Sequence, residues 1–200
     1  MTNAFRRVGV TFVALSFALC SIPAPTPAGA SEEDDQQRAL ALLQHGCGTP
    51  VAQVNSSSDE QDPFVTADGS ALYFDSSRAG FLDLYVAVRR GDGSFDAPQP
   101  LTNLNTTTTD GHPRLTQDGL TLYWSSTRSD GGAQGGTDIW LATRASTAGS
   151  FGTPTRVPEL SSASNESLSW IAPDGCVAYL QSDRTGTIGA QDVFVAVKPL

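Results

Sequence analysis

Short apolar runs separated by polar turns fill most of the chain. One set of runs is 71–74 (ALYF), 121–124 (TLYW) and 177–180 (VAYL), and a second is 84–88 (LYVAV), 139–143 (IWLAT) and 193–197 (VFVAV). Nearly continuous apolar runs of this length predict strands that are covered on both faces. Helical signals occur only in residues 31–46, with Ser31 as N-cap and Gly46 as the stop. The pattern predicts an all-β chain behind one short helix.

The apolar runs belong to a repeat. Three units align on their Asp-Gly pairs at 68–69, 118–119 and 174–175, which are 50 and 56 residues apart. In each unit a tyrosine follows at the fifth position, a serine at the eighth and an arginine at the tenth. A period of this length is typical of solenoids and propeller blades.

Each unit is predicted to contain four strands. Strand A precedes the Asp-Gly pair (63–66, 113–116 and 169–172), and the two apolar runs form strands B and C. Strand D begins at "SFDAP" and "SFGTP" and runs toward Leu104 and Leu160. Asp and Gly tolerate left-handed backbone angles, so the Asp-Gly pairs are expected to form the turns between strands A and B.

The pattern "DP…ADGSALYFDSSR…DLYVA" resembles the WD-like repeat of TolB-type β-propellers, and the resemblance covers residues 47–198. It implies blades of four antiparallel strands around a central channel, with strand A innermost. It also implies a role in contacts between proteins.

The number of blades raises the question of how the ring closes. The chain has three repeats, whereas propellers typically have four to eight blades. The third unit stops after strand C, and "CGTPVAQVN" (47–55) matches the strand D segment "FGTPTRVPEL" (151–160). The order is therefore D-ABCD-ABCD-ABC. Two chains could exchange their D strands in a homodimeric six-bladed ring, or three blades could form an open arc shielded by the helix.

Residues 1–30 have the layout of a secretory signal peptide. Arg6 and Arg7 precede an apolar core, and Ala28-Gly29-Ala30 is a small-residue cleavage site. Cleavage after Ala30 and a periplasmic or secreted location are expected. A lipid anchor on Cys20 is disfavoured by the bulky Leu19, and the arginine pair fits an ordinary leader better than a twin-arginine signal.

Charge narrows the range of partners. After cleavage, ten basic residues remain against twenty-one acidic ones. Such a surface repels phosphate backbones, so nucleic acid is not expected as a partner. No other run is long and apolar enough to cross a membrane.

Two cysteines remain after cleavage, Cys47 and Cys176, and in an exported protein they are a candidate disulfide. Regular blade geometry opposes the bond, because strands B and D are separated by strand C. The alternative is two small buried apolar side chains.

Arginines and aspartates that recur in every unit suggest a structural role. Because the Arg begins the loop between strands B and C and the Asp ends it, each Arg is expected to pair with the Asp of its own blade. The expected pairs are Arg78–Asp83, Arg128–Asp138 and Arg184–Asp192.

Strand A and the residues leading into it supply the candidate binding residues, because they should face the channel or its mouth. They are Glu60, Asp62, Phe64, Asp110, His112, Arg114, Glu166 and Trp170. An acidic ring formed by Glu60, Asp110 and Glu166 could bind a basic peptide or Ca²⁺, although no EF-hand spacing is present. The alternative is that these acids form turns or hydrogen bonds between blades.

Catalytic signatures are missing from the sequence. It has no G-x-S-x-G motif, and neither His45 nor His112 lies in a triad or zinc pattern. The sequence therefore predicts an exported, non-enzymatic binding or scaffold protein without a required cofactor, whose partner is a protein segment or small ligand. The alternatives are a propeller-type hydrolase acting on glycans or peptides, and a structural fragment of a larger repeat protein.

Overall fold

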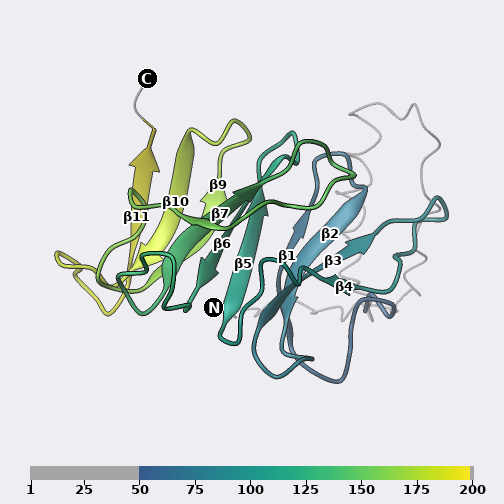
Figure 1. Ribbon diagram of the computed structural model, residues 1–200, viewed down its shortest axis with the longest axis horizontal. Coiled ribbons are helices and arrows are strands. Elements are labelled where there is room, and N and C mark those ends of the chain that lie inside the picture. Colours follow the sequence, from purple (N-terminus) through teal and green to yellow (C-terminus); the bar gives the residue numbers. More distant parts are fainter. Residues whose placement is uncertain (1–49, 199–200) are drawn as a thin grey trace, which may run out of the picture. The chain divides into compact units, whose positions relative to one another are not determined.

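The computed structural model describes residues 50–198, which belong to one compact unit. Eleven strands form three antiparallel sheets, shown in chain order in Figure 1. The first sheet contains β1 (Glu60–Val65), β2 (Ala71–Ser76), β3 (Asp83–Val88) and β4 (Gln99–Pro100). The second contains β5 (Asp110–Leu115), β6 (Thr121–Ser126), β7 (Asp138–Thr143) and β8 (Thr155–Arg156). The third contains β9 (Glu166–Ile171), β10 (Val177–Ser182) and β11 (Asp192–Val197).

The predicted all-β blade architecture is confirmed. Strands follow their chain order within each sheet, and β5 lies against β1 of the sheet before it and β9 of the sheet after it. The three sheets, named here blades 1, 2 and 3, therefore meet along their first strands. Within residues 50–198, no helix is long and apolar enough to cross a membrane. The predicted leader, the helix at 31–46, Cys20 and Cys47 lie outside the described residues.

The Asp-Gly pairs form the turns that the sequence predicts. Gly69, Gly119 and Gly175 have φ angles of 69°, 67° and 70°, in the left-handed region that glycine adopts without steric cost. The aspartate before each glycine accepts a hydrogen bond from the backbone N–H two residues later. Each turn therefore joins the first two strands of a blade in the same register.

The contacts between blades form two apolar cores. Between blades 1 and 2, Trp124 and Trp140 pack with Leu84 and Leu122, all of them buried. Between blades 2 and 3, Ile139 packs with residues of β9 and β10. These cores explain the continuous apolar runs, because the middle strands of blade 2 are covered on both faces.

The fourth strands of blades 1 and 2 are shorter than predicted. β4 and β8 have two residues each, and proline at 98 and 100 interrupts the ladder on β4 because it has no N–H to donate. Each short strand leads into a turn whose last residues bind back to Leu101 and Val157.

An equivalent turn precedes blade 1, where Val54 N–H and Asn55 N–H both donate to Val51 O. Val51, Leu101 and Val157 are therefore equivalent positions. Pro50 is therefore equivalent to Pro100 and Arg156. The alignment of CGTP with FGTP would make Pro50 equivalent to Pro154 instead, so that predicted alignment is wrong by two residues.

Candidate functional site

The repeated arginines form a clamp within each blade. Arg128 donates to Leu104 O (2.6 Å), to Asp110 Oδ1 (2.8 Å) and to Ser126 Oγ (2.9 Å). Its guanidinium also lies over the rings of Trp124 and Trp140. Arg78 makes the same contacts with Val54 O, Glu60 and Ser76, and Arg184 with Leu160 O, Glu166 and Ser182.

The predicted Arg–Asp pairs are therefore wrong. Instead of Asp83, Asp138 and Asp192, the arginines contact the acid that begins the first strand of the blade. The reason is the register, which places Glu60, Asp110 and Glu166 directly opposite the serine two residues before each arginine. Asp138 Oδ2 accepts N–H groups of Gln134 and Gly135, and Asp192 accepts that of Ile188, so these aspartates fix the loop through its backbone.

The clamp occupies the three acids that were expected to form an acidic ring. Asp110 and Glu166 are fully buried, and Glu60 is largely covered. This arrangement matches the structural alternative for these acids. Among residues 50–198, no three His, Cys, Asp or Glu side chains gather as a metal site. Binding of Ca²⁺ stays a prediction.

Other predicted channel residues do come together on the first strands. His112 Nδ1 lies 2.9 Å from Asp62 Oδ2, and Arg114 Nη2 lies 3.9 Å from Asp62 Oδ1. Arg114 Nε donates to Ser169 O on β9, beside the exposed Trp170. Asp62, His112 and Arg114 are called the inner-strand cluster below. Phe64 packs beside the core between blades 1 and 2 and is not in this cluster.

Two members of the inner-strand cluster have unusual backbone angles. Asp62 (φ 48°) and His112 (φ 56°) are non-glycine residues in the left-handed region, and each lies in a β-bulge before a proline. Such conformations cost about 1–3 kcal/mol and cluster at functional sites. The bulges direct the two side chains toward each other across neighbouring blades.

Sequence reasoning missed a buried carboxylate beside this cluster. Asp75 on β2 is 1% exposed, and its Oδ2 accepts the backbone N–H of His112 (2.9 Å). Its Oδ1 has no hydrogen-bond partner among the described residues. Burial raises the pKa of Asp75, and the hydrogen bond from His112 opposes the rise. The signal available in the sequence was an acid inside an otherwise apolar strand B.

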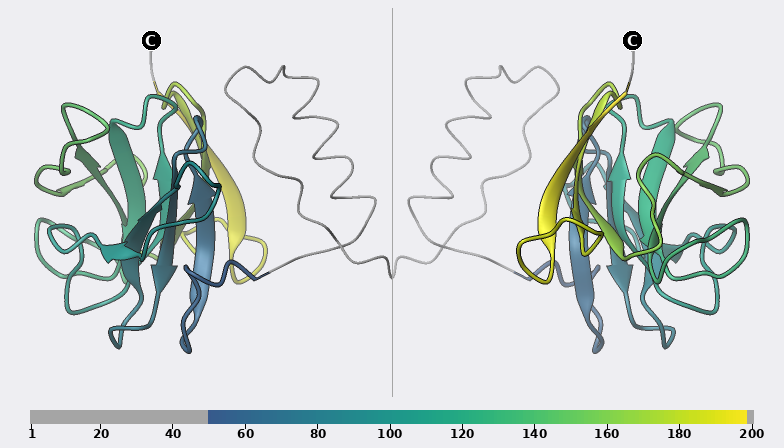
Figure 2. Two further views of the ribbon diagram at one scale, coloured as in Figure 1. Left: turned by 90° about the vertical axis from the view of Figure 1, so that its right-hand side faces the viewer. Right: turned by 90° about the vertical axis from the view of Figure 1, so that its left-hand side faces the viewer.

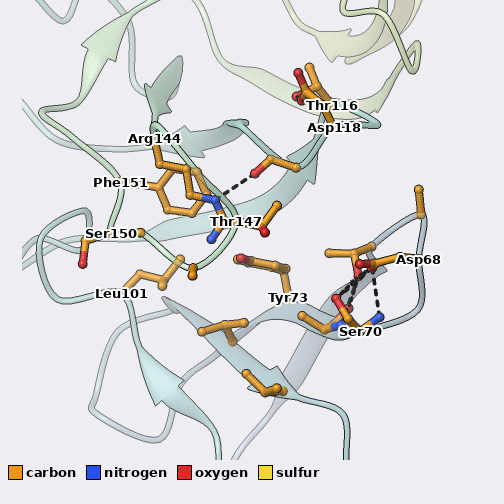
Figure 3. Close-up of a pocket in the computed structure, with 18 of the residues that line it drawn as sticks. Asp68, Ser70, Tyr73, Leu101, Thr116, Asp118, Arg144, Thr147, Ser150 and Phe151 are labelled. Carbon is orange, nitrogen blue, oxygen red and sulfur yellow. Dashed lines mark hydrogen bonds between the residues drawn. The ribbon is translucent and has the colours of Figure 1, made fainter.

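A cavity of about 830 Å³ lies between blades 1 and 2, at the end of the blades that carries the Asp-Gly turns. It is called the inter-blade cavity below. Its walls come from β2, β3 and β4, from the turn at 116–119, and from the loop at 144–151. Figure 3 shows these residues around the opening, with Arg144, Phe151 and Tyr73 close together.

Arg144 is the cation of the inter-blade cavity. Its Nε donates to Gly119 O (2.8 Å), and its Cζ lies 4.5 Å from the centre of the Phe151 ring. In Figure 3 the guanidinium and the Tyr73 hydroxyl point toward each other. Burial raises the pKa of Tyr73, and the positive charge of Arg144 opposes the rise. The hydroxyl therefore stays neutral at physiological pH and can both donate and accept a hydrogen bond.

The cavity has the composition of a small-ligand site. Its volume lies within the roughly 300–1,000 Å³ of known ligand pockets. Leu101 and Val86 supply apolar surface, and Asn103, Ser150 and Thr147 supply polar groups. A guanidinium held by one backbone carbonyl keeps further N–H donors free for a ligand, and those donors match a carboxylate or phosphate.

Cys176 is half-buried and has no disulfide partner among residues 50–198. Its Sγ lies 3.7 Å from Asp174 O in the turn of blade 3. Because Cys47 lies outside the described residues, the disulfide between them stays a prediction.

Comparison with known proteins identifies similar folds. No protein-family model and no curated protein matches the chain. TolB from Acinetobacter baumannii is similar to it, with a TM-score of 0.49 and 16% identity over 72% of this chain and 31% of TolB. An endo-1,4-beta-xylanase from Bacteroides thetaiotaomicron is also similar, with a TM-score of 0.47 and 15% identity over 76% of this chain and 57% of that protein. The chain covers less than two thirds of the length of either structure.

Proposed function

We propose that the protein is an exported, non-enzymatic binding module that holds a small organic acid in the inter-blade cavity. The observation that carries the proposal is the placement of Arg144, whose guanidinium faces a cavity with both apolar and polar walls. A carboxylate of the ligand accepts two parallel hydrogen bonds from the guanidinium. The apolar or aromatic body of the ligand packs against Leu101 and Phe151.

The geometry suits binding better than catalysis. Asp68 and Asp118 are the carboxylates at the cavity, and each is engaged by hydrogen bonds of its own turn. Neither is in a position to act as a free general base without breaking that turn. A module of this kind recognises the carboxylate of its ligand. The C-terminal carboxylate of a peptide is one such group.

The test uses matched small molecules as probes. Ligand-observed NMR with benzoate and phenylacetate, against benzamide and phenylacetamide, separates recognition of the carboxylate from contact with the ring. We expect binding of the acids over the amides, and about tenfold or greater weakening in Arg144→Gln, because a charge-assisted hydrogen bond contributes about 1.5–3 kcal/mol.

Arg90→Gln is the matched control, since Arg90 forms an exposed pair with Asp96 and does not line the cavity. Its binding should equal that of the wild type. Equal binding of acids and amides, or acid binding that survives Arg144→Gln, would contradict the proposal.

The inner-strand cluster supports a second candidate function, the docking of a protein segment at the channel face. The observation in its favour is the 2.9 Å contact between His112 Nδ1 and Asp62 Oδ2, two residues whose backbones are both in the left-handed region. Peptides selected on the wild-type protein should bind Arg114→Gln and His112→Ala more weakly. Peptides that bind these variants as well as the wild type would exclude a role for the cluster.

A further inference from the structure

Blade 3 exposes apolar side chains, and most of their equivalents in blades 1 and 2 are buried or half-buried. Val193 on β11 is 71% exposed, whereas the equivalent Leu84 and Ile139 are fully buried. Tyr179 on β10 is 44% exposed, whereas the equivalent Tyr73 is 3% exposed. This terminal face consists of Trp170, Tyr179, Val193, Val195 and Val197, of which Val197 has an equivalent, Val88, that is exposed as well. Figure 2, in its right-hand view, shows β11 in yellow on the side nearest the viewer.

The edge of β11 is open as well. In blade 1, Leu84 N–H donates to Asn105 Oδ1 (2.8 Å), and Asn105 Nδ2 and Leu101 N–H both donate to Leu84 O. In blade 2, Ser161 and Val157 do the same for Ile139. Among the described residues, the third sheet ends at β11 without a fourth strand. The backbone of Val193 therefore faces outward where its equivalents are paired.

The missing partners stand at the other end of the described chain. Val51 and Asn55 occupy the positions of Leu101 and Asn105, in a turn with the same two hydrogen bonds. Arg78 holds this turn through Val54 O, as Arg128 holds the turn before blade 2 through Leu104 O. Asn55 is exposed, although its equivalent Asn105 is half-buried against blade 1. This turn is therefore built to follow a blade, and the described residues contain none before it.

The first strand of blade 1 has an apolar side chain that a preceding blade would cover. Val65 is 53% exposed, whereas the equivalents Leu115 and Ile171 are buried between blades. A blade placed before blade 1 would cover Val65 as blade 1 covers Leu115. The face that needs a following blade and the face that needs a preceding blade are thus both present in one chain.

We propose that two copies of this chain close a six-bladed ring, in which blade 3 of each copy packs on blade 1 of the other. Val51 N–H and the Asn55 amide of one copy bind the backbone of Val193 of its partner, following the pattern seen at Leu84 and Ile139. Trp170 and Tyr179, whose ring centres are 5.8 Å apart, anchor the contact with Val65. Such a ring leaves no open edge on β11.

Ring closure also adds a cavity of the inter-blade type at each junction between copies. Arg89 directly follows β3 as Arg144 directly follows β7, and each guanidinium lies near the glycine of its own Asp-Gly turn. In the ring, Arg89 faces Tyr179 of the partner copy, as Arg144 faces Tyr73 within one chain. The assembly therefore bears on the number of ligand sites, although the assembly itself does not rest on the proposed ligand.

The first experiment is the mass of the full chain, as exported and processed by its host, by light scattering on a sizing column. We expect two chains per particle at micromolar concentration. Val193→Asp and Asn55→Ala should each shift the particle toward one chain. Asn105→Ala is the matched control: it removes the same amide inside one chain, so it should lower the unfolding temperature and leave two chains per particle.

Other outcomes overturn the ring. One chain per particle in the wild type, with loss of thermal stability in Val193→Asp, would show that residues of the same chain cover the terminal face. Two chains per particle that persist in Asn55→Ala and in Val65→Asp would show that the two β11 edges pair with each other instead.

Discussion

Arg128 and Asp110 form a salt bridge of 2.8 Å in which both side chains are removed from water. The arginine belongs to the loop after β6 and the acid begins β5, so the pair fixes the first two strands of blade 2. Because Arg128 also binds Leu104 O, it ties blade 2 to the turn that leaves blade 1. One guanidinium thus joins two neighbouring blades.

A variant that lacks Arg128 should unfold at a lower denaturant concentration than the wild type. Arg128→Ala leaves Asp110 buried without its partner, and breaking such a pair typically costs about 3–5 kcal/mol. Arg78→Ala should cost less, because Arg78 and Glu60 are more exposed. Urea unfolding measures both losses, and the surface variant Arg90→Ala is the control. Equal midpoints for Arg128→Ala and Arg90→Ala would show that the clamp adds nothing to stability.

The contacts of the repeated arginines could be predicted from residue spacing that is constant between units, but not from the acid nearest to each arginine in the sequence. From the acid to the arginine the distance is 18 residues in every unit, at 60–78, 110–128 and 166–184. From the arginine to the following aspartate it is 5, 10 and 8 residues. Partners across a hairpin of fixed register keep a constant spacing, whereas a loop of variable length does not. Constant spacing was the better guide.

The blades themselves could be predicted because each strand carries its own pattern. Strands B and C occur where the apolar runs indicate, and the turns form at the three Asp-Gly pairs. The inter-blade cavity could not be predicted in this way. Arg144 and Tyr73 lie in different blades, and the loop at 144–151 that shapes the wall has no counterpart of equal length in the other repeats.

Asp75 should make stability depend on pH in the direction opposite to most carboxylates. Its pKa is raised above 3.8 by burial, so the folded state binds the proton more tightly than the unfolded state. The free energy of unfolding therefore falls as pH rises from about 4 through the folded pKa. Asp75→Asn keeps an acceptor for His112 N–H and removes the charge. It should be the more stable protein at pH 7, with the difference closing toward pH 4 in urea titrations. A difference that does not change with pH would show that Asp75 is not the group responsible.

The aspartates of the Asp-Gly turns should make stability depend on pH in the direction that is usual for carboxylates, with stability lost as pH falls. The backbone N–H of Ser70 lowers the pKa of Asp68, and the hydroxyl of Thr116 lowers that of Asp118. Each contributes stability above its unfolded pKa that is lost as pH falls through the folded value. Asp118→Ala should therefore be destabilised at pH 7 and approach the wild type below about pH 3, the range in which carboxylates become protonated. Asp118→Asn, which keeps an acceptor, should lose less at pH 7. Unfolding temperatures of the wild type and both variants, measured from pH 7 to below pH 3, test this prediction. If Asp118→Ala is still destabilised at low pH, the destabilisation comes from lost side-chain packing and not from the charge.

Gly135 should tolerate no side chain, because the loop after β6 docks closely on the turn before β9. A Cβ at Gly135 would overlap the backbone carbonyl of Ser164 and lie 2.9 Å from Ser162 O. The parallel bridge between Thr137 and Asn165 holds the same two segments together. Neither backbone can retreat without opening the contact between blades 2 and 3, so Gly135→Ala should cost about 3 kcal/mol, at the upper end of overpacking. For a protein of this size that loss lowers the unfolding temperature by about 6–12 °C. Gly91→Ala is the control, since a Cβ there meets no atom within 4 Å, and it should leave the unfolding temperature unchanged. Equal unfolding temperatures for the two variants would show that blade 3 separates from this loop without loss of stability.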